Sequence, residues 1–346
     1  MPLINEIRLS NFRNFRQKSF KFDSADVVFT GENGTGKSNI LEAVGYLSTL
    51  RSFRHSPVRD MVTIGEESFS VEADVACGKS FRTLRVCEGV SGSRELFLGR
   101  ERCRKASDFI LEYRCVAFSP GDFAIGSGAS GVRRRFFDQL ISSVDRNYLL
   151  SLSQYNRALS QRNRAAKMKN ASAMRAFESV LAENAPGIVL ARKEAAFQLE
   201  QAVRSLLAGK YDFSIRYKPD FEGVPEDILR RYASTREKEM IRGCSTSGVQ
   251  LDEFELILNG KLLRTFGSTG QIRVITLLMR LAEFTLMRRS HTTPVAVLAD
   301  DVTGELDESN RELFFRTIST ADARFHTYAV LPEDKTLSNA QFIKLY

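Results

Sequence analysis

Residues 31–38 read GENGTGKS and match the spacing G-x-x-x-x-G-K-[ST] of a phosphate-binding loop. A short apolar strand pattern, DVVFT at 26–30, precedes the loop, and a helical pattern follows it from residue 39. Glycines let successive backbone N–H groups converge on an anion, and a helix N-terminus adds the positive end of its dipole. The alternative interpretation is a glycine-rich turn that caps a helix. The flanking strand and helix favour the phosphate-binding loop and an α/β fold.

Two side chains of this loop are expected to act on a bound nucleotide. Lys37 would reach the β- and γ-phosphates, and the Ser38 hydroxyl would bind Mg²⁺. The pattern therefore predicts ATP and Mg²⁺ as cofactors. The residues expected to line the ATP site here are Gly31, Glu32, Asn33, Gly34, Thr35, Gly36, Lys37 and Ser38.

A second apolar strand pattern, VAVLA at 295–299, ends in Asp300 and Asp301. A buried strand that ends in acidic residues is how P-loop enzymes hold Mg²⁺ and position the attacking water. We expect Asp300 to contact the metal, and Asp301 to act as the general base or to orient the water. Two acidic residues that cap a turn are the alternative.

Two further loops carry weaker signals. Ser268, Thr269, Gly270 and Gln271 stand at the start of a helical pattern that extends to 288, where they would form another anion site. Their order between the phosphate-binding loop and the acidic strand resembles the signature loop of the ABC class, although an ordinary helix cap is the alternative. GELD at 304–307 resembles the D-loop of that class, which predicts Gly304 and Asp307 at a dimer interface. A turn capped by Asp307 is the alternative there.

Composition and charge narrow the class of protein. The chain has 346 residues, of which 43% are hydrophobic and 27% are charged, as in ordinary globular proteins. Five cysteines without a CxxC pair, and only three histidines, exclude zinc-ligand spacing and indicate reduced thiols. The N-terminus does not resemble a signal peptide, and no apolar run approaches the length of a membrane span. We therefore expect a cytoplasmic protein that does not contact a membrane.

The order of strand and helix patterns along the chain predicts an ATPase head that is built from both ends of the chain. Strand patterns dominate up to FSPGDF at 118–123, whereas amphipathic helical spacing covers 131–169 and 172–208, with a break expected at Pro186. Strand patterns return at 211–217 and 253–258. We assign 1–118 and 248–346 to the head, and 119–247 to an inserted, mainly helical lobe.

Several motifs in this order resemble an ABC-type ATPase head and, more closely, the RecF family of bacterial DNA-repair ATPases. LSNFRNF at 9–15 is similar to the opening strand and turn of that family, and RSFRH at 51–55 follows the first helix as it does there. FSPGDFAIGSGASGVRRRFFD at 118–138, FELILNGKLLRTFGSTGQIR at 254–273 and ADDVTGELD at 299–307 resemble further RecF stretches. The resemblance covers essentially the whole chain.

The chain departs from the RecF pattern in four places. The family's Gly-Pro-His-Arg-Asp-Asp run appears as GVQLDE at 248–253, without the basic residues. Asp300-Asp301 differs from the Asp-Glu pair common in other ABC heads. The last strand reads FHTYA at 325–329, which leaves open whether His326 is a switch residue or a packed strand residue. FSP at 118–120 contains no Gln for a Q-loop.

Basic residues form a local patch. Residues 100–170 contain 14 basic and 6 acidic side chains, an excess equal to the net charge of +8 of the whole chain. A solvated helix face is the alternative, but a patch beside these motifs favours binding of the DNA backbone with little base readout. The residues expected to contact DNA are Arg51, Arg54, Arg133, Arg134, Arg135, Arg162 and Arg164.

The resemblance implies an ATP-gated homodimeric clamp of recombinational repair and replication restart, with weak DNA-stimulated ATPase activity. It implies action on double-stranded DNA and on single-strand/double-strand junctions, with RecR and RecO as partners in loading RecA. One alternative is another DNA-linked ABC head of the SMC, Rad50 or OLD type. The absence of long heptads disfavours the first two, and the absence of a metal-dependent nuclease constellation disfavours the third. A P-loop kinase or small-molecule transferase is the second alternative. Such an enzyme would not need the Ser268–Gln271 loop, so ATP turnover without DNA stimulation or dimerisation would favour it.

Overall fold

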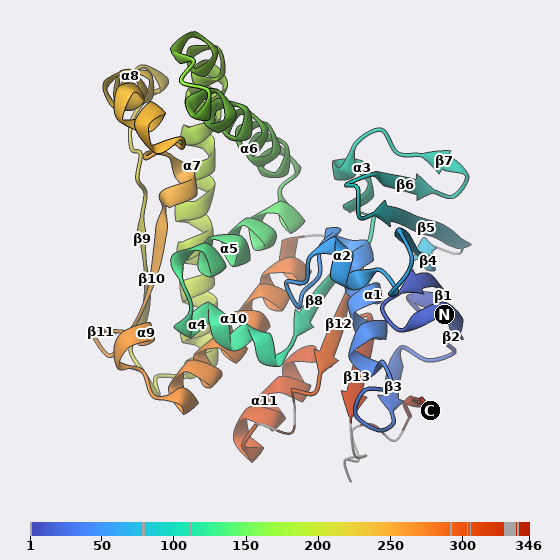
Figure 1. Ribbon diagram of the computed structural model, residues 1–346. Helices are drawn as coiled ribbons and strands as arrows, with labels where there is room; N and C mark the ends of the chain where they lie inside the picture. The colour runs from blue at the N-terminus through green and yellow to red at the C-terminus, as the bar shows by residue number, and fades with distance from the viewer. Residues whose placement is uncertain are drawn as a thin grey trace. The chain divides into compact units, whose positions relative to one another are not determined.

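The computed structural model describes residues 2–77, 80–110, 112–290, 293–302, 304, 306–328, 337 and 339–346. The chain forms two compact units (Figure 1). Unit 1 comprises Met1–Asp122 and Met279–Tyr346, and unit 2 comprises Phe123–Leu278. The first expected boundary, at 118/119, lies close to this division. Residues 248–278 were expected in the head but belong to unit 2, because their strand pairs with a strand of that unit.

Unit 1 contains a six-stranded antiparallel sheet in the order β2-β1-β4-β5-β6-β7. Its strands are β1 (Ile4–Phe12), β2 (Phe15–Lys21), β4 (Ser68–Cys77), β5 (Ser80–Gly89), β6 (Arg94–Leu98) and β7 (Glu101–Arg102). Apolar side chains alternate along β1 and β4, so one face of this sheet is buried.

The second sheet of unit 1 has five parallel strands in the order β14-β3-β13-β12-β8. They are β3 (Asp26–Thr30), β8 (Arg114–Phe118), β12 (Val295–Asp300), β13 (Ala323–Tyr328) and β14 (Gln341–Lys344). Every residue of β12 is buried, as expected for a central parallel strand. The parallel order brings the carboxyl ends of β3, β13 and β12 to one edge of the sheet. The loop after β3 and the acids after β12 therefore meet there.

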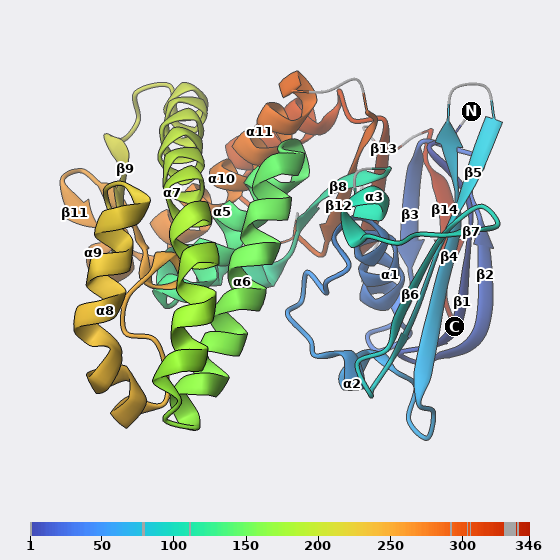
Figure 2. The ribbon, with the colours of Figure 1, turned by 90° about the horizontal axis from the view of Figure 1, so that it is seen from above.

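Helix α1 (Lys37–Thr49) packs against strands of both sheets (Figure 2). The core of unit 1 combines its side chains Ile40, Leu41, Val44 and Leu47 with those of the strands. The other helices of this unit are α2 (Val58–Met61), α3 (Ala106–Ile110), the 3₁₀ turn Pro120–Asp122 and α11 (Glu308–Ile318). α11 packs on the parallel sheet through edge-to-face contact between Phe314 and Phe118.

Unit 2 is mainly helical and contains a small antiparallel sheet in the order β11-β10-β9. Its helices are α4 (Phe123–Ser127), α5 (Ser130–Val144), α6 (Arg146–Lys167), α7 (Ala171–Leu207), α8 (Pro225–Arg242), the 3₁₀ turn Val249–Leu251 and α9 (Leu263–Phe266). Its strands are β9 (Phe213–Lys218), β10 (Glu253–Leu258) and β11 (Lys261–Leu262). Helix α10 (Thr269–Ser290) begins in unit 2 and ends in unit 1.

Two features of unit 2 differ from the sequence-based expectation. The break expected at Pro186 is wrong, because α7 is one continuous helix of 37 residues that contains Pro186. Ala182, Ala185 and Ile188 are fully buried on either side of the proline, and this packing outweighs the lost backbone hydrogen bond. Helix α8 was not expected at all. It starts with Pro225 at its first turn and ends at Gly243, which adopts φ +72°.

Candidate functional site

The loop at 31–38 has a backbone that requires glycine. Gly31, Gly34 and Gly36 all have positive φ angles, of 147°, 90° and 102°. A Cβ atom on Gly36 would lie 2.7 Å from the Asn14 amide and from the Phe15 ring, and one on Gly31 would lie 2.5 Å from a backbone oxygen. Any larger residue would therefore distort the loop. A loop that requires glycine agrees with the sequence pattern, and phosphate binding by this loop stays a prediction.

The start of α1 suits an anion. Among the described residues, no side chain caps this helix N-terminus and no acidic residue lies in its first turn. Lys37 is 9% exposed, and its ammonium donates to the carbonyl oxygens of Gly31 (2.7 Å) and Glu32 (2.8 Å). The loop therefore holds a cation beside uncapped N–H groups. These groups fit the phosphates of a nucleotide.

Asp300 lies next to this loop at the end of β12. Its carboxylate accepts a hydrogen bond of 2.9 Å from Thr327 at the end of β13, and the Ser38 side chain lies near enough to lower its pKa by hydrogen bonding. Burial raises the pKa of Asp300, while these two hydrogen bonds and the charge of Arg54 act in the opposite direction. A hydroxyl and a carboxylate that lie close together are ligands suited to Mg²⁺. The donor set therefore fits the expected metal.

Asp301 is exposed and has a φ angle of +53°. Its backbone N–H donates to the Thr327 hydroxyl at 3.0 Å, so Thr327 contacts both acidic residues. The expected role of Asp301 in orienting water stays a prediction. Thr327 itself was not predicted, although it follows His326, which the sequence singled out. The signal that could have found it is strand alternation, which places Thr327 and His326 on opposite faces of β13.

Glu42 is a second residue that sequence reasoning missed. It is 0% exposed and lies on α1, one helical turn after Ser38. Arg13 donates to both of its oxygens, at 2.7 and 2.6 Å, and Ser52 donates to one of them. A buried acid in an otherwise apolar helix is visible in the sequence, but its partners come from distant loops.

The two weaker loops form helix caps. Ser268 and Gln271 exchange side-chain to backbone hydrogen bonds of 2.9 and 3.2 Å, which is the reciprocal capping box of α10. Thr269 and Gly270 are exposed beside them. Asp307 caps α11 by accepting from the Asn310 backbone at 2.8 Å, and Gly304 has open space around it. Glu305 of the same loop lies outside the described residues. Roles at a dimer interface stay predictions.

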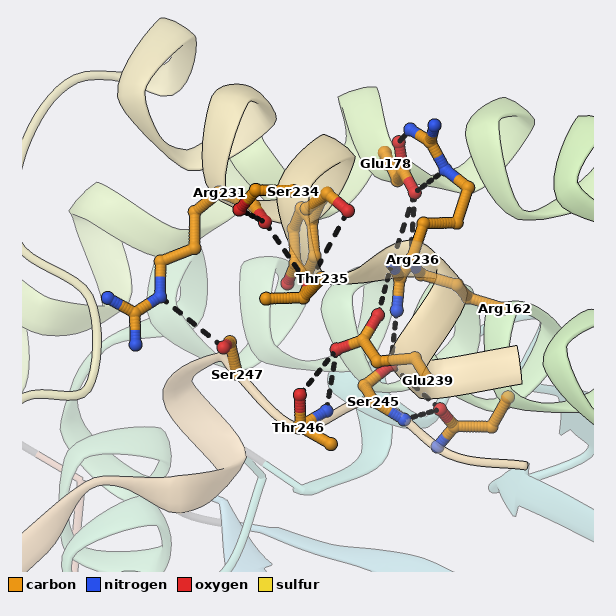
Figure 3. A network of polar contacts seen from close by, with 12 residues as sticks. Arg162, Glu178, Arg231, Ser234, Thr235, Arg236, Glu239, Ser245, Thr246 and Ser247 are labelled. Atoms are coloured by element: carbon orange, nitrogen blue, oxygen red, sulfur yellow. Dashed lines mark hydrogen bonds and ion pairs between the residues drawn. The ribbon is translucent and has the colours of Figure 1, made fainter. Parts of the chain in front are cut away.

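Two arginines expected on DNA are buried, and their prediction as DNA contacts is wrong. Arg162 has a side chain that is 0% exposed, and Glu239 (2.7 Å) and Glu178 (3.1 Å) neutralise it (Figure 3). Its guanidinium also lies 4.4 Å from the centroid of the Tyr232 ring. Arg133 is 2% exposed and pairs with Glu253 at 2.7 Å. Periodicity alone cannot distinguish a buried, paired arginine from an exposed one.

The retained acidic half of the GVQLDE run has a structural role in unit 2. Asp252 is fully buried and lies 2.7 Å from the Arg192 guanidinium, which also binds Asp138 at 2.8 Å. Glu253 pairs with Arg133. Arg134 donates to the backbone oxygen of Asp252 at 2.6 Å and is only partly exposed. Both acids of this run are therefore held by internal ion pairs within unit 2.

The remaining basic candidates are exposed. Arg135 and Arg164 lie on the surface of α5 and α6, and Arg51 and Arg54 lie after α1. Residues 146–177 contain no acidic residue. The exposed cations in this stretch are Arg146, Arg157, Arg164, Lys167, Lys169 and Arg175. The end of α6 therefore carries unbalanced positive charge, and it does so through residues other than Arg162.

Three other expectations concern groups outside this site. In the part of the chain that the structure describes, no group of three His, Cys, Asp or Glu could hold a metal ion. Cys87, Cys103, Cys115 and Cys244 are free thiols. Among the described helices, none is long and apolar enough to cross a membrane.

Comparisons with known proteins agree with this geometry. Residues 3–343 match the family model described as RecF/RecN/SMC N terminal domain. The DNA replication and repair protein RecF of Leptospira interrogans is 30% identical over 332 residues, which cover 94% of this chain and 91% of that protein. RecF of Bacillus cytotoxicus is 30% identical over 358 residues, covering 98% and 96%.

Solved structures extend the match to the fold. The structure of the recombination mediator protein RecF-ATP in the RecFOR pathway has a TM-score of 0.88 at 25% identity, covering 96% of this chain and 93% of that one. An Smc head domain with an extended coiled coil, from Pyrococcus furiosus, has a TM-score of 0.50 at 15% identity, which shows a shared fold only. The predicted α/β ABC-type head with an inserted helical lobe is confirmed. The chain belongs to the RecF family.

Proposed function

We propose that this chain is an ATP-dependent DNA-binding clamp that acts in recombinational repair and replication restart. The observation that carries the proposal is the close approach of Ser38, at the start of α1, to the carboxylate of Asp300, at the end of β12, whose pKa Ser38 lowers. This close approach joins the phosphate-binding loop to the acidic strand across β13. Relatives named DNA replication and repair protein RecF, and a RecF structure with ATP, support the same conclusion.

The residues that would hold ATP are those of the loop at 31–38. Backbone N–H groups and the Lys37 ammonium would bind the phosphates, while Ser38 and Asp300 would ligate Mg²⁺. Bound Mg²⁺ would neutralise phosphate charge. Asp301 would orient the water that attacks the terminal phosphate, giving ADP and phosphate. We propose a slow hydrolysis that DNA stimulates.

The residues proposed for DNA contact in the two units are the exposed members of the original candidates and, in unit 2, the cations at the end of α6. Arg164, Lys167 and Lys169 offer three exposed cations within six residues and without a neighbouring acid in sequence. Arg51, Arg54 and Arg135 are exposed elsewhere. Such cations bind phosphates of any sequence, which suits a clamp on double-stranded DNA and on junctions.

A homodimer would complete the ATP site. The exposed Ser268–Gln271 cap would meet the nucleotide of a second protomer, and Gly304 and Asp307 would lie at that interface. Hydrolysis would then open the clamp. RecR and RecO are the partners that we propose for loading RecA, in line with the RecFOR pathway named for the structural relative.

Sedimentation velocity with Mg²⁺ and a slowly hydrolysed ATP analogue, with and without a short DNA duplex, tests the proposal. We expect a monomer without nucleotide and a dimer on DNA when both ligands are present. Lys37→Ala should remain monomeric, because the loop loses the cation that binds the phosphates. Lys21→Ala, which removes an exposed lysine of β2 in the same unit, is the matched control and should dimerise. A wild-type chain that binds DNA equally without nucleotide, and never dimerises, would refute the clamp.

A further inference from the structure

The buried carboxylate of Glu42 joins two arginines from different loops. Arg13, from the turn between β1 and β2, binds it through two hydrogen bonds of 2.7 and 2.6 Å. Arg54, which follows α1, approaches it at 3.7 Å with a side chain that is 41% exposed. Glu42 itself is 0% exposed. One buried charge therefore holds an exposed arginine against the helix that starts at the phosphate-binding loop.

Glu42 also determines the shape of the segment 51–56. The Ser52 hydroxyl donates a hydrogen bond to Glu42. The Ser52 Oγ atom also accepts hydrogen bonds from the backbone N–H groups of Arg54 (3.0 Å) and Ser56 (3.2 Å). Arg13 donates to the Ser56 hydroxyl at 2.6 Å. Ser52 and Arg13, which hold this segment, both donate to the Glu42 carboxylate, so removal of its charge would release both the segment and the Arg54 side chain.

A chain of polar contacts leads from Arg54 back to the phosphate-binding loop. Arg54 donates to the Asn39 side-chain oxygen at 2.9 Å, in the first turn of α1. Asn39 donates to the Asn14 side-chain oxygen at 2.8 Å, and Asn14 donates to the Thr35 carbonyl at 3.3 Å. The Asn14 amide also occupies the space that a Cβ on Gly36 would need. The loop and Arg54 therefore share one ordered network.

We propose that Glu42 is a positioning residue that couples DNA phosphate binding at Arg54 to nucleotide phosphate binding at the loop within one protomer. The inference rests on the proposed function, since it assumes that both ligands bind. A nucleotide orders the loop and, through Asn14 and Asn39, the segment 51–56. DNA then meets a segment that is already ordered and loses less conformational entropy on binding, which makes the coupling favourable. Linkage requires the same factor in both directions.

Glu88 supplies a matched control for a purely structural role. It is a buried carboxylate in the same unit, 4% exposed, and Arg94 binds it through two hydrogen bonds of 2.7 and 2.6 Å. It also accepts from the Tyr46 hydroxyl, on the same helix as Glu42. Glu88→Gln therefore removes a comparable buried charge beside α1 without touching Arg54.

The test measures the affinity for a fluorescent DNA duplex by anisotropy, with and without ADP and Mg²⁺. ADP fills the loop but lacks the phosphate that a second protomer would contact, so dimer closure does not contribute. In the wild type and in Glu88→Gln we expect ADP to tighten DNA binding about fivefold, at the low end of typical couplings. In Glu42→Gln the factor should fall below about twofold. Arg54→Ala changes only the surface and should lose the same coupling, so this variant tests the inference if Glu42→Gln does not fold.

Each outcome distinguishes the inference from the function on which it rests. If the wild type binds both ligands but ADP leaves its DNA affinity unchanged or weakens it, the inference is overturned and the proposed function still stands. Equal loss in Glu88→Gln and Glu42→Gln shows a structural role only and also overturns it. A wild-type chain that binds no DNA or no nucleotide refutes both proposals. Calorimetric titration of ADP with and without DNA should give the same factor as anisotropy.

Discussion

The Thr327 hydroxyl donates a 2.9 Å hydrogen bond to the Asp300 carboxylate, and the two residues are direct neighbours in the parallel register of β13 and β12. The same hydroxyl accepts from the backbone N–H of Asp301. Thr327 therefore fixes the direction of the Asp300 carboxylate, which lies near the Ser38 side chain. This position on the central strand makes Thr327 a positioning residue for the proposed Mg²⁺ site.

Thr327→Val should lower ATP turnover by about tenfold, because a misdirected metal ligand costs on the order of 1.4 kcal/mol in the transition state. Valine has the same shape but lacks the hydroxyl, so the affinity for ATP should change less than turnover. Steady-state phosphate release and calorimetric ATP titration measure the two quantities. Thr327→Ser keeps the hydroxyl and should restore turnover. Equal activity of the valine and serine variants would exclude a positioning role.

Asp300→Asn should stabilise the ligand-free chain while abolishing Mg²⁺-dependent nucleotide binding. Burial raises the pKa of Asp300, so the folded state disfavours the charged carboxylate, and stability is lost as the pH rises through the folded pKa. Asparagine removes this charge, and its amide oxygen can still accept the hydrogen bond from Thr327. We expect a melting temperature about 2–4 °C higher at neutral pH. A lower melting temperature together with retained Mg²⁺ dependence would contradict the assigned role.

Replacement of Arg164, Lys167 and Lys169 by Ala should weaken DNA binding and flatten its salt dependence. Each lost phosphate contact lowers the slope of log K against log salt by about 0.9 on duplex DNA. Stability should hardly change, because these side chains are exposed. The measurement is an anisotropy titration at several salt concentrations. An unaltered slope would move the DNA contact to Arg51 and Arg54.

Arg162→Ala, on the same helix, provides the contrasting variant. Its removal leaves Glu239 buried without the arginine that pairs with it, whereas Glu178 keeps its ion pair with Arg236, and the loss costs about 3–5 kcal/mol. We therefore expect a clearly lower melting temperature and, in the folded protein, an unchanged salt slope. A thermal melt beside the titration checks both. A reduced slope with unchanged stability would restore Arg162 as a DNA contact.

His326 should make the fold sensitive to acid. Burial lowers the pKa of His326 to about 4 from 6.5, and neither ring nitrogen has a hydrogen-bond partner among the described residues. Because the folded pKa is depressed, its contribution to stability is complete above pH 6.5 and is lost as the pH falls toward 4. Between about pH 7.5 and about pH 5, the free energy of unfolding should therefore fall by about 2 kcal/mol less in His326→Phe than in the wild type, as measured by urea unfolding. Equal losses would show that His326 does not titrate with folding.

Local sequence signals predicted the elements that depend on neighbours in the chain. β3 and β10 have the expected bounds, because apolar strand patterns depend on adjacent residues, and Asp307 caps α11 in line with the alternative interpretation of that turn. The glycines of 31–36 predicted a loop that only glycine can form. The start and end of α8 were also readable, from Pro225 and Gly243, and were overlooked. The break expected at Pro186 was wrong because the lost backbone hydrogen bond can be read from the sequence, whereas the tertiary packing that outweighs this loss cannot.

The sequence by itself determined the phosphate-binding loop, the acidic strand end and the family, because these depend on residue types at fixed spacing. Only the tertiary structure decided which charges face solvent. Arg162 and Arg164 lie two residues apart on one helix, yet Glu239 on α8 neutralises the first while the second is exposed. The contacts of Asp300 with Thr327, and of Glu42 with Arg13, join residues that are 27 and 29 positions apart. Strand order and loop packing bring such partners together, and no local pattern encodes them.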